Sequence, residues 1–301
     1  MIRPVNFGFN EQTADSNAFQ KNGEQTEVQQ KALHEFDAFV QVLRQNGVQV
    51  KVIDDTPEQH TPDSIFPNNW ISFHQNGSVF LYPMQAENRR LERKVFRLIK
   101  EAFDIKEVFD LTYFEAQNQF LEGTGSLVLD RENKLAYACL SPRTDAEVLN
   151  EFCRISGYQN VLFHATDQTG KAIYHTNVLM ALGDQFVVIC LDSIANETEK
   201  STVKTALQQS GKEIVEINFE QMNAFAGNML QLKNDSGESL LIMSETAFLS
   251  LKEAQIKTLK KFCRLIYSSL NTIETNGGGS ARCMMAEVFC KLNDNFKKCF
   301  R

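Results

Sequence analysis

The chain of 301 residues lacks an excess of basic side chains, because 31 lysines and arginines stand against 38 aspartates and glutamates, a net charge of −7. Proteins that bind nucleic acids or anionic membranes usually have the opposite balance, so a small-molecule partner is expected. No apolar run approaches the roughly 18 residues of a membrane span, and the N-terminal residues contain no apolar stretch typical of a secretory signal. The sequence therefore predicts a soluble cytoplasmic protein without nucleic-acid or membrane partners, and it leaves a homo-oligomer open.

The usual signatures of metal and phosphate sites are also missing. The seven cysteines are odd in number and form no C-x-x-C pair, which argues against a disulfide framework and a zinc knuckle. The five histidines include no H-E-x-x-H pattern, and the glycine-rich segment lacks the lysine of a phosphate loop. We expect reduced thiols, no metal and no cofactor.

What the chain does contain is a repeated pattern of hairpin, helix and strand, on a composition that is 43% hydrophobic and can bury a core. Paired apolar runs with turn residues between them, such as Asn76-Gly77, precede four of five amphipathic stretches. These stretches begin near Thr26, Glu87, Thr144, Asn196 and Ser250. A short β-type run follows each of them, at residues 48–53, 105–111, 160–164, 213–217 and 271–275.

Five such units in one chain suggest an α/β ring, because units that cannot bury their own faces must stack or close on one another. In a closed ring, the N-terminal strand would pair beside residues 282–290. We therefore predict one pseudo-symmetric domain over residues 1–301, and the alternative is an ordinary α/β sandwich.

The most unusual segment is 276–283, in which three consecutive glycines precede Ser280 and Arg282-Cys283. Glycines allow close approach of the backbone to a ligand, and a neighbouring arginine can lower the pKa of a thiol. Cys283 is therefore a candidate nucleophile, and the alternative is a glycine turn that leads into a half-buried structural cysteine. A nucleophilic cysteine needs a proton carrier, for which His175 is the best placed histidine and His164 the rival.

Charged residues near the expected strand ends complete the candidate site. Glu122 and Asp63 could bind a planar group that carries N–H donors, although both positions are also typical of turn caps. Arg143 precedes a helix N-terminus, where the helix dipole disfavours a cation, so it is a candidate anion binder. Arg90 is a weaker candidate that also fits a solvated helix face.

The motifs P-D-S-I-F-P-N-N, L-E-G-T-G, L-S-P-R-T, Y-H-T-N and G-G-G-S-A-R-C occur in this order along nearly the whole chain. Together they resemble the guanidine-modifying superfamily of pentein fold, which includes arginine deiminase, dimethylargininase and the amidinotransferases. The resemblance is closest to the branch that contains citrulline ureidase, and it implies an α/β-propeller of five ββαβ-type units with pseudo-five-fold symmetry. It also implies that Cys283 is the nucleophile, His175 the acid/base and Glu122 the carboxylate beside it.

By the same matching, Asp63 would hold a substrate N–H group, and Arg143 and Arg90 would bind the substrate carboxylate. One departure concerns the substrate. Where dimethylargininase has an acidic pair, this chain has Asn68-Asn69, and the L-E-G-G-D of related enzymes reads L-E-G-T-G. Amides both donate and accept hydrogen bonds, so they suit a neutral ureido group better than a cationic guanidinium.

The hypothesis from sequence is a cofactor-free hydrolase that converts citrulline to ornithine, carbon dioxide and ammonia through a covalent Cys283 intermediate. The second hypothesis is a deiminase of arginine or methylarginine that gives citrulline. An amidinotransferase and a non-catalytic binding protein of the same fold are the further alternatives.

Overall fold

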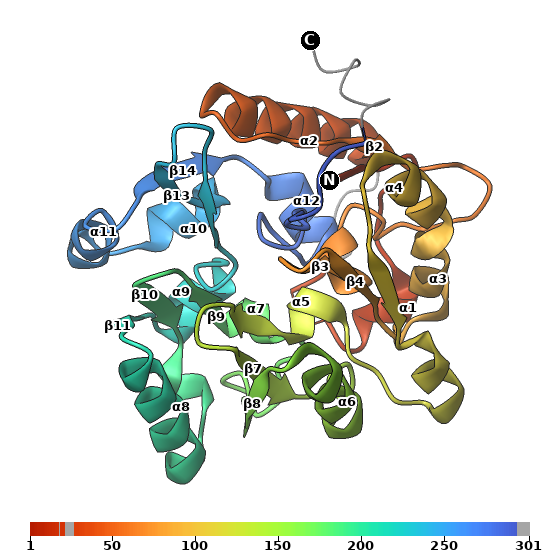
Figure 1. Ribbon diagram of the computed structural model, residues 1–301. Helices are drawn as coiled ribbons and strands as arrows, with labels where there is room; N and C mark the ends of the chain where they lie inside the picture. The colour runs from red at the N-terminus through yellow and green to blue at the C-terminus, as the bar shows by residue number, and fades with distance from the viewer. Residues whose placement is uncertain (18, 22–26, 294–301) are drawn as a thin grey trace.

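The computed structural model describes residues 1–17, 19–21 and 27–293 and arranges them as five small sheets around a common centre (Figure 1). Within the described residues, four sheets have three strands and one has two. No helix in this part of the chain is both long and apolar enough to cross a membrane. The arrangement confirms the predicted ring of repeated α/β units.

The four three-stranded sheets share one topology, in which an antiparallel hairpin is followed by a third strand that pairs in parallel with the second. A parallel pairing requires a crossover connection, which the helix of each unit supplies. The sheets are β3 (Ile71–Phe73), β4 (Ser78–Leu81) and β5 (Glu107–Asp110); β6 (Val128–Asp130), β7 (Leu135–Leu140) and β8 (Gln159–His164); β9 (Met180–Leu182), β10 (Phe186–Ile189) and β11 (Glu213–Glu216); β12 (Leu230–Lys233), β13 (Ser239–Ser244) and β14 (Arg264–Ser268).

Most of the crossover helices begin close to the positions that the sequence predicts. Asn196 caps α8 through its side chain, and α6 ends at Gly157, whose φ of 74° is left-handed. Asp145, one residue after the expected Thr144, is the N-cap of α6. The crossovers are α3 (Glu87–Arg90), the 3-10 helix η2 (Leu91–Val95) and α4 (Phe96–Ala102); α6 (Ala146–Ser156); α8 (Glu197–Gln209); and α10 (Glu245–Ser250) with α11 (Glu253–Leu259).

The N-terminal unit has only two strands, because β1 (Ile2–Arg3) pairs in parallel with β2 (Ile53–Asp54). Between them lie α1 (Glu11–Ala14) and α2 (Val28–Gln45). The expected start of this helix at Thr26 lies outside the described residues.

The predicted strand over residues 282–290 is wrong. Residues 281–284 form turns instead, and the amides of Cys283 and Met284 donate to the carbonyl of Ser280. The chain then reaches the β3–β4–β5 unit, where Leu292 forms an antiparallel bridge with Phe103. The backbone N–H groups of residues 282–285 donate to the carbonyls of Asn228, Ser280 and Arg282, so they are not available to pair with β1.

The predicted strand over residues 271–275 is also wrong, because this segment lies in helix α12 (Asn271–Gly277) and β14 is the strand of that unit. The carboxylate of Glu35, on α2, accepts the amides of Thr272 and Ile273 at 2.8 and 3.0 Å. A carboxylate at the first turn satisfies free N–H groups and complements the helix dipole, so a distant residue stabilises this helix.

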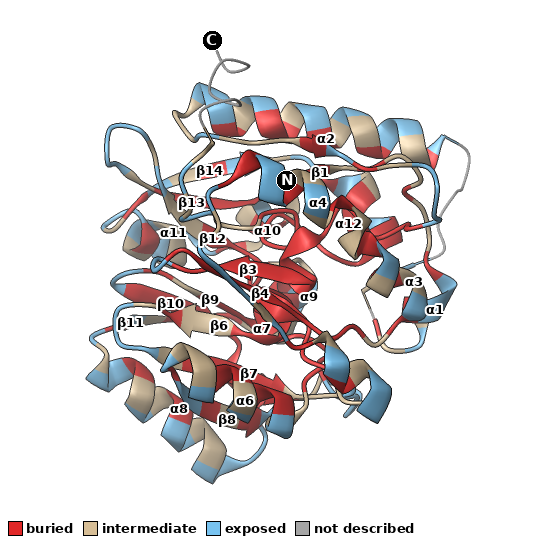
Figure 2. Cartoon of the chain, turned by 45° about the vertical axis from the view of Figure 1, so that its right-hand side comes forward, coloured by how far each residue is buried: buried red, intermediate tan, exposed pale blue. Residues whose placement is uncertain are grey.

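Short elements lie just before the hairpin strands and face the centre of the ring. Figure 1 shows α5 and α7 there, with α2, α6, α8 and α11 at the rim. Figure 2 shows buried residues concentrated in the strands and the central turns, whereas the rim helices are exposed on their outer faces. The remaining elements are η1 (Pro67–Asn69), η3 (Thr112–Gln117), α5 (Gly123–Ser126), α7 (Thr176–Leu179), η4 (Leu191–Ser193) and α9 (Phe219–Asn223).

Candidate active site

A buried histidine–carboxylate pair lies at the centre of the ring. Glu122 is the N-cap of α5 and His175 the N-cap of α7, and Nε2 of His175 lies 2.8 Å from Oε2 of Glu122. Glycine is required between them, since a Cβ atom at Gly125 would lie 2.8 Å from Nδ1 of His175. Two segments 53 residues apart are thus brought into one hydrogen bond.

The charges of this pair follow from its surroundings. Burial raises the pKa of Glu122, but the Arg143 guanidinium and the His175 hydrogen bond outweigh it and lower the pKa to about 2. Burial lowers the pKa of His175 to about 4 despite the adjacent carboxylate. At neutral pH the pair is therefore a neutral imidazole that donates from Nε2 to a carboxylate, which leaves Nδ1 as a proton acceptor.

Cys283 reaches the same centre from the other end of the chain. Its side chain is buried, and Sγ accepts hydrogen bonds from the amide nitrogens of Asn177 at 3.4 Å and Asn228 at 3.2 Å. Asn177 lies two residues after His175, so the turn that carries the imidazole also contacts the thiol. The structure therefore places Cys283 against the turn that carries His175, whose imidazole contacts Glu122.

The loop before β3 contributes Asp63, Asn68 and Asn69, all buried. Asp63 accepts a hydrogen bond from Asn10 at 2.7 Å, and Asn69 accepts one from Nη1 of Arg89 at 2.8 Å. Burial raises the pKa of Asp63 although Arg89 lies nearby.

Arg89 is a functional candidate that the sequence analysis missed. Its buried guanidinium binds Glu92 at 2.7 and 3.1 Å and lies 3.7 Å from Asp63 and 3.9 Å from Glu122. Arg90, the predicted residue, lies outside this cluster, where it donates to the carbonyls of Met84 and Gln85. Successive helical residues point about 100° apart, so in this one-turn helix only one of the two can face inward.

Arg143 joins the cluster from the turn before α6. Nη1 lies 3.5 Å from Glu122, and the other nitrogens donate to Ser16 and to the carbonyl of Thr13. Its guanidinium also lies over the ring of Tyr174, at 4.8 Å from the ring centre. The predicted Arg143 is therefore at the site, where it links the Glu122 carboxylate to the segment around α1.

Several buried polar atoms in this region have no hydrogen-bond partner among the described residues. An unpaired buried polar atom costs about 1–3 kcal/mol, so a group of them in one place indicates atoms that a ligand satisfies. They are Nε2 of Gln20, Oδ1 of Asp63, Nδ2 and Oδ1 of Asn68, Nδ2 of Asn69, and Oδ1 of Asn177.

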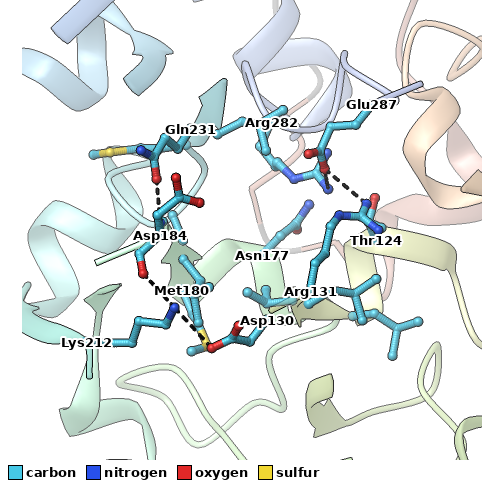
Figure 3. Close-up of a pocket in the computed structure, with 18 of the residues that line it drawn as sticks. Thr124, Asp130, Arg131, Asn177, Met180, Asp184, Lys212, Gln231, Arg282 and Glu287 are labelled. Atoms are coloured by element: carbon cyan, nitrogen blue, oxygen red, sulfur yellow. Dashed lines mark hydrogen bonds and ion pairs between the residues drawn. The ribbon is translucent and has the colours of Figure 1, made fainter. Parts of the chain in front are cut away.

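A cavity of about 120 Å³ borders the site through Asn177 and Arg282 (Figure 3). Its charged groups bind one another. Lys212 pairs with Asp130 at 3.1 Å, and Glu287 lies 3.7 Å from Arg282 and 3.4 Å from Arg131. Within the described residues, no group of three or more His, Cys, Asp or Glu side chains is placed to hold a metal ion.

The sequence model of a protein family, N,N dimethylarginine dimethylhydrolase of the eukaryotic type, matches residues 3–290. The chain belongs to this family. Membership confirms the predicted guanidino-modifying superfamily. No match is found among curated protein sequences.

Several solved structures superpose on this chain over most of its length. An arginine dihydrolase from the ornithine-ammonia cycle in cyanobacteria, ArgZ, superposes with a TM-score of 0.77 at 14% identity over 98% of this chain. The chain spans 41% of the length of that protein. The N-terminal domain of ArgZ bound to substrate has a TM-score of 0.75 at 14% identity, with 96% of this chain and 98% of the domain covered.

A dimethylarginine dimethylaminohydrolase variant with an S-methyl-L-thiocitrulline adduct has a TM-score of 0.62 at 16% identity, with 94% and 96% of the two chains covered. These likenesses confirm the predicted pentein fold.

Proposed function

We propose that the whole chain acts as one unit that hydrolyses the ureido group of a small amino acid, with L-citrulline as the preferred substrate. Ornithine, carbon dioxide and ammonia are the products. The family and the structural neighbours support a hydrolase of guanidino-type amino acids, and the choice of a ureido substrate rests on one side chain, Asn69.

The orientation of the Asn69 amide is set by its partner. An arginine has only donors, so the atom that Arg89 contacts must be the Asn69 carbonyl oxygen, and Nδ2 points the other way. Nδ2 has no partner among the described residues, and a Cβ atom at Gly125 would overlap with it while lying 2.8 Å from the His175 ring. A free N–H donor beside His175 suits the carbonyl oxygen of a ureido group, which a guanidinium does not have.

The charge of the pocket supports the same choice. Arg89 already places a guanidinium against Glu92, Asp63 and Glu122, so these carboxylates have a protein cation in reach. Arg89 and Arg143 together supply two cations to these three carboxylates, which leaves less uncompensated negative charge to bind a substrate guanidinium. A neutral ureido group needs no such counter-charge.

In the proposed reaction, Sγ of Cys283 attacks the ureido carbon and its proton passes to Nδ1 of His175. Asn69 and Asn68 donate to the oxygen on which negative charge develops. The C–N bond to the ornithine side then breaks, and His175 returns the proton to the departing amine. The remaining carbamoyl-thioester is hydrolysed by a water that His175 deprotonates, and the carbamate breaks down to carbon dioxide and ammonia.

The charged residues have supporting roles in this scheme. Glu122 stabilises the imidazolium form of His175, and Asp63 accepts a substrate N–H group through its unpaired Oδ1. Arg143 holds the substrate carboxylate through Nη1. Arg90 is left out of the scheme because two backbone carbonyls hold its guanidinium.

The test is amino-acid product analysis of the purified protein with L-citrulline, L-arginine and methylated arginines in separate reactions. Ornithine and ammonia from citrulline, lost in Cys283→Ala, is the expected result. Citrulline from arginine or a methylated arginine would overturn the substrate choice in favour of the deiminase hypothesis. Unchanged turnover in Cys283→Ala would overturn the covalent mechanism itself.

A further inference from the structure

Four of the five units contribute polar side chains to the centre of the ring. In three of them the side chains lie in the turn before the first hairpin strand, and in the fourth they lie in the C-terminal segment. These are Asn69 before β3, Glu122 before β6, His175 with Asn177 before β9, and Cys283. The remaining unit contributes Asn228, two residues before β12, and its side chain is buried at 2% exposure.

The geometry assigns Asn228 as a positioning residue that holds Sγ of Cys283 and favours its thiolate form, an inference that rests on the proposed function. Oδ1 of Asn228 accepts the backbone amide of Arg282 at 3.1 Å. A backbone N–H can only donate, so the side-chain atom that Arg282 contacts is the oxygen, and the other terminal atom of the Asn228 side chain is Nδ2. Its two hydrogens go to Sγ at 3.2 Å and to the carbonyl of Asn177 at 3.0 Å.

Asn177 also donates to Sγ, but its orientation is less constrained. Its Oδ1 has no partner among the described residues, and its side chain reaches the cavity shown in Figure 3. In Asn228, by contrast, Oδ1 and both N–H groups of the side-chain amide are engaged by protein atoms. The donor from Asn228 is therefore the one whose direction the fold determines.

The turn that carries Asn228 is built at a conformational cost. Phe225 has a φ of 62°, which is rare for a bulky side chain. The backbone N–H of Asn228 closes the turn by donating to the Phe225 carbonyl at 2.8 Å. Gly227 lies so close to α7 that a Cβ atom there would overlap with the carbonyl oxygen of Val178. The turn is thereby pressed against the segment that carries His175 and Asn177.

An N–H donor directed at sulfur stabilises the charged thiolate over the neutral thiol, and only the thiolate attacks carbon. The exchange Asn228→Asp keeps the shape and the acceptor for Arg282, but it replaces the donor with a negative charge beside Sγ. We expect the thiolate of Cys283 to form at higher pH in this variant. The same exchange at exposed Asn223, at the end of α9, is the matched control.

The experiment is alkylation of the full chain by iodoacetamide across a pH series, with Cys283 followed by peptide mass spectrometry. The other described cysteines should react slowly, because burial raises the pKa of each thiol. The pKa rises to about 11 or 12 for Cys139, Cys153, Cys190 and Cys263, and it rises in Cys290 as well. This readout needs no substrate, so it stands even where citrulline is not hydrolysed.

The midpoint of Cys283 alkylation should move upward by at least one pH unit in Asn228→Asp and remain at the wild-type value in Asn223→Asp. With citrulline, kcat should fall at least tenfold in Asn228→Asp while KM stays within threefold. A folded Asn228→Asp with the wild-type midpoint overturns the inference. If that variant does not fold, Asn228→Ser decides in its place, since a serine hydroxyl is too short to bridge Arg282 and Sγ.

Discussion

Arg89 donates from Nη1 to Oδ1 of Asn69 across 2.8 Å, and both side chains are buried. The contact orients the Asn69 amide so that its N–H donors are turned away from the arginine. A carboxylate at this position would accept from Arg89 equally well, so the contact itself does not require an amide. What an amide adds is the donor on the opposite side, and this difference separates a ureido pocket from a guanidinium pocket.

We therefore predict that Asn69→Asp lowers kcat/KM for citrulline by roughly 100-fold, the usual effect of removing a donor to a developing oxyanion. The ratio of kcat/KM for arginine to that for citrulline should rise at least tenfold, because a carboxylate favours a cation. Steady-state kinetics with both substrates measures this, and Asn223→Asp is the control. An unchanged ratio would show that Asn69 does not select the substrate.

The His175–Glu122 pair predicts a pH dependence of stability. The pKa of His175 is about 4 in the folded protein, below the ordinary 6.5, so the unfolded chain binds a proton that folded His175 does not between these values. The free energy of unfolding must then fall as the pH drops below about 6.5, by about 2 kcal/mol for this residue down to pH 5. The effect of Glu122, whose pKa is about 2, begins only below about pH 4.5.

Urea unfolding at pH 7 and at pH 5 tests this account through His175→Gln. The variant should lose about 2 kcal/mol less than wild type between the two values, because it lacks the proton uptake. His164→Gln is the control, since the side chain of His164 is 67% exposed and pairs with Glu199. Equal losses in His175→Gln and wild type would mean that folded His175 titrates normally.

Much of the fold could be predicted because its signals are local. The Asn196 cap, the Gly157 helix end and the left-handed Gly237 in the β12–β13 turn each act within a few residues. Two of the errors arise from specific contacts. Glu35 caps α12 from another helix, and the C-terminal segment forms turns around Cys283 where a strand was expected. No periodicity over 271–275 or 282–290 reports such contacts.

The site divides in the same way. The sequence places Glu122 and His175 at the starts of hairpin strands, and the ring brings them together. The choice between Arg89 and Arg90 depends on the phase of a one-turn helix, which composition does not reveal. Asn228 did leave a signal, since three of the four hairpin runs have an asparagine at or next to their start: N-N-W-I-S-F, T-N-V-L-M-A-L and N-M-L-Q-L-K.

The paired neighbours Arg89 and Arg90 allow a direct test of burial. Arg89→Met removes the counter-charge of buried Glu92 and Asp63, and we expect a loss of about 3–5 kcal/mol in the free energy of unfolding. Arg90→Met, whose side chain is 28% exposed, should cost about 1 kcal/mol or less. Adding Glu92→Gln to Arg89→Met should recover part of the loss. Equal effects of the two single variants in urea unfolding would contradict the buried role of Arg89.

Two glycines test the packing of the turn that carries Asn228. A Cβ atom at Gly227 would lie 2.8 Å from the carbonyl carbon of Val178 and overlap with its oxygen, and neither backbone atom can rotate away. Gly227→Ala should therefore lower the free energy of unfolding by roughly 3 kcal/mol, and Gly8→Ala, where no atom lies within 4 Å of the added methyl, should change it by about 1 kcal/mol or less. Thermal unfolding of both variants measures the contrast.

Because the displaced turn would also withdraw the Asn228 donor, Cys283 in folded Gly227→Ala should alkylate at higher pH, as in Asn228→Asp. A Gly227→Ala variant as stable as Gly8→Ala would show that the turn is free to move off α7, and the fixed direction of the Asn228 donor would then have no structural basis.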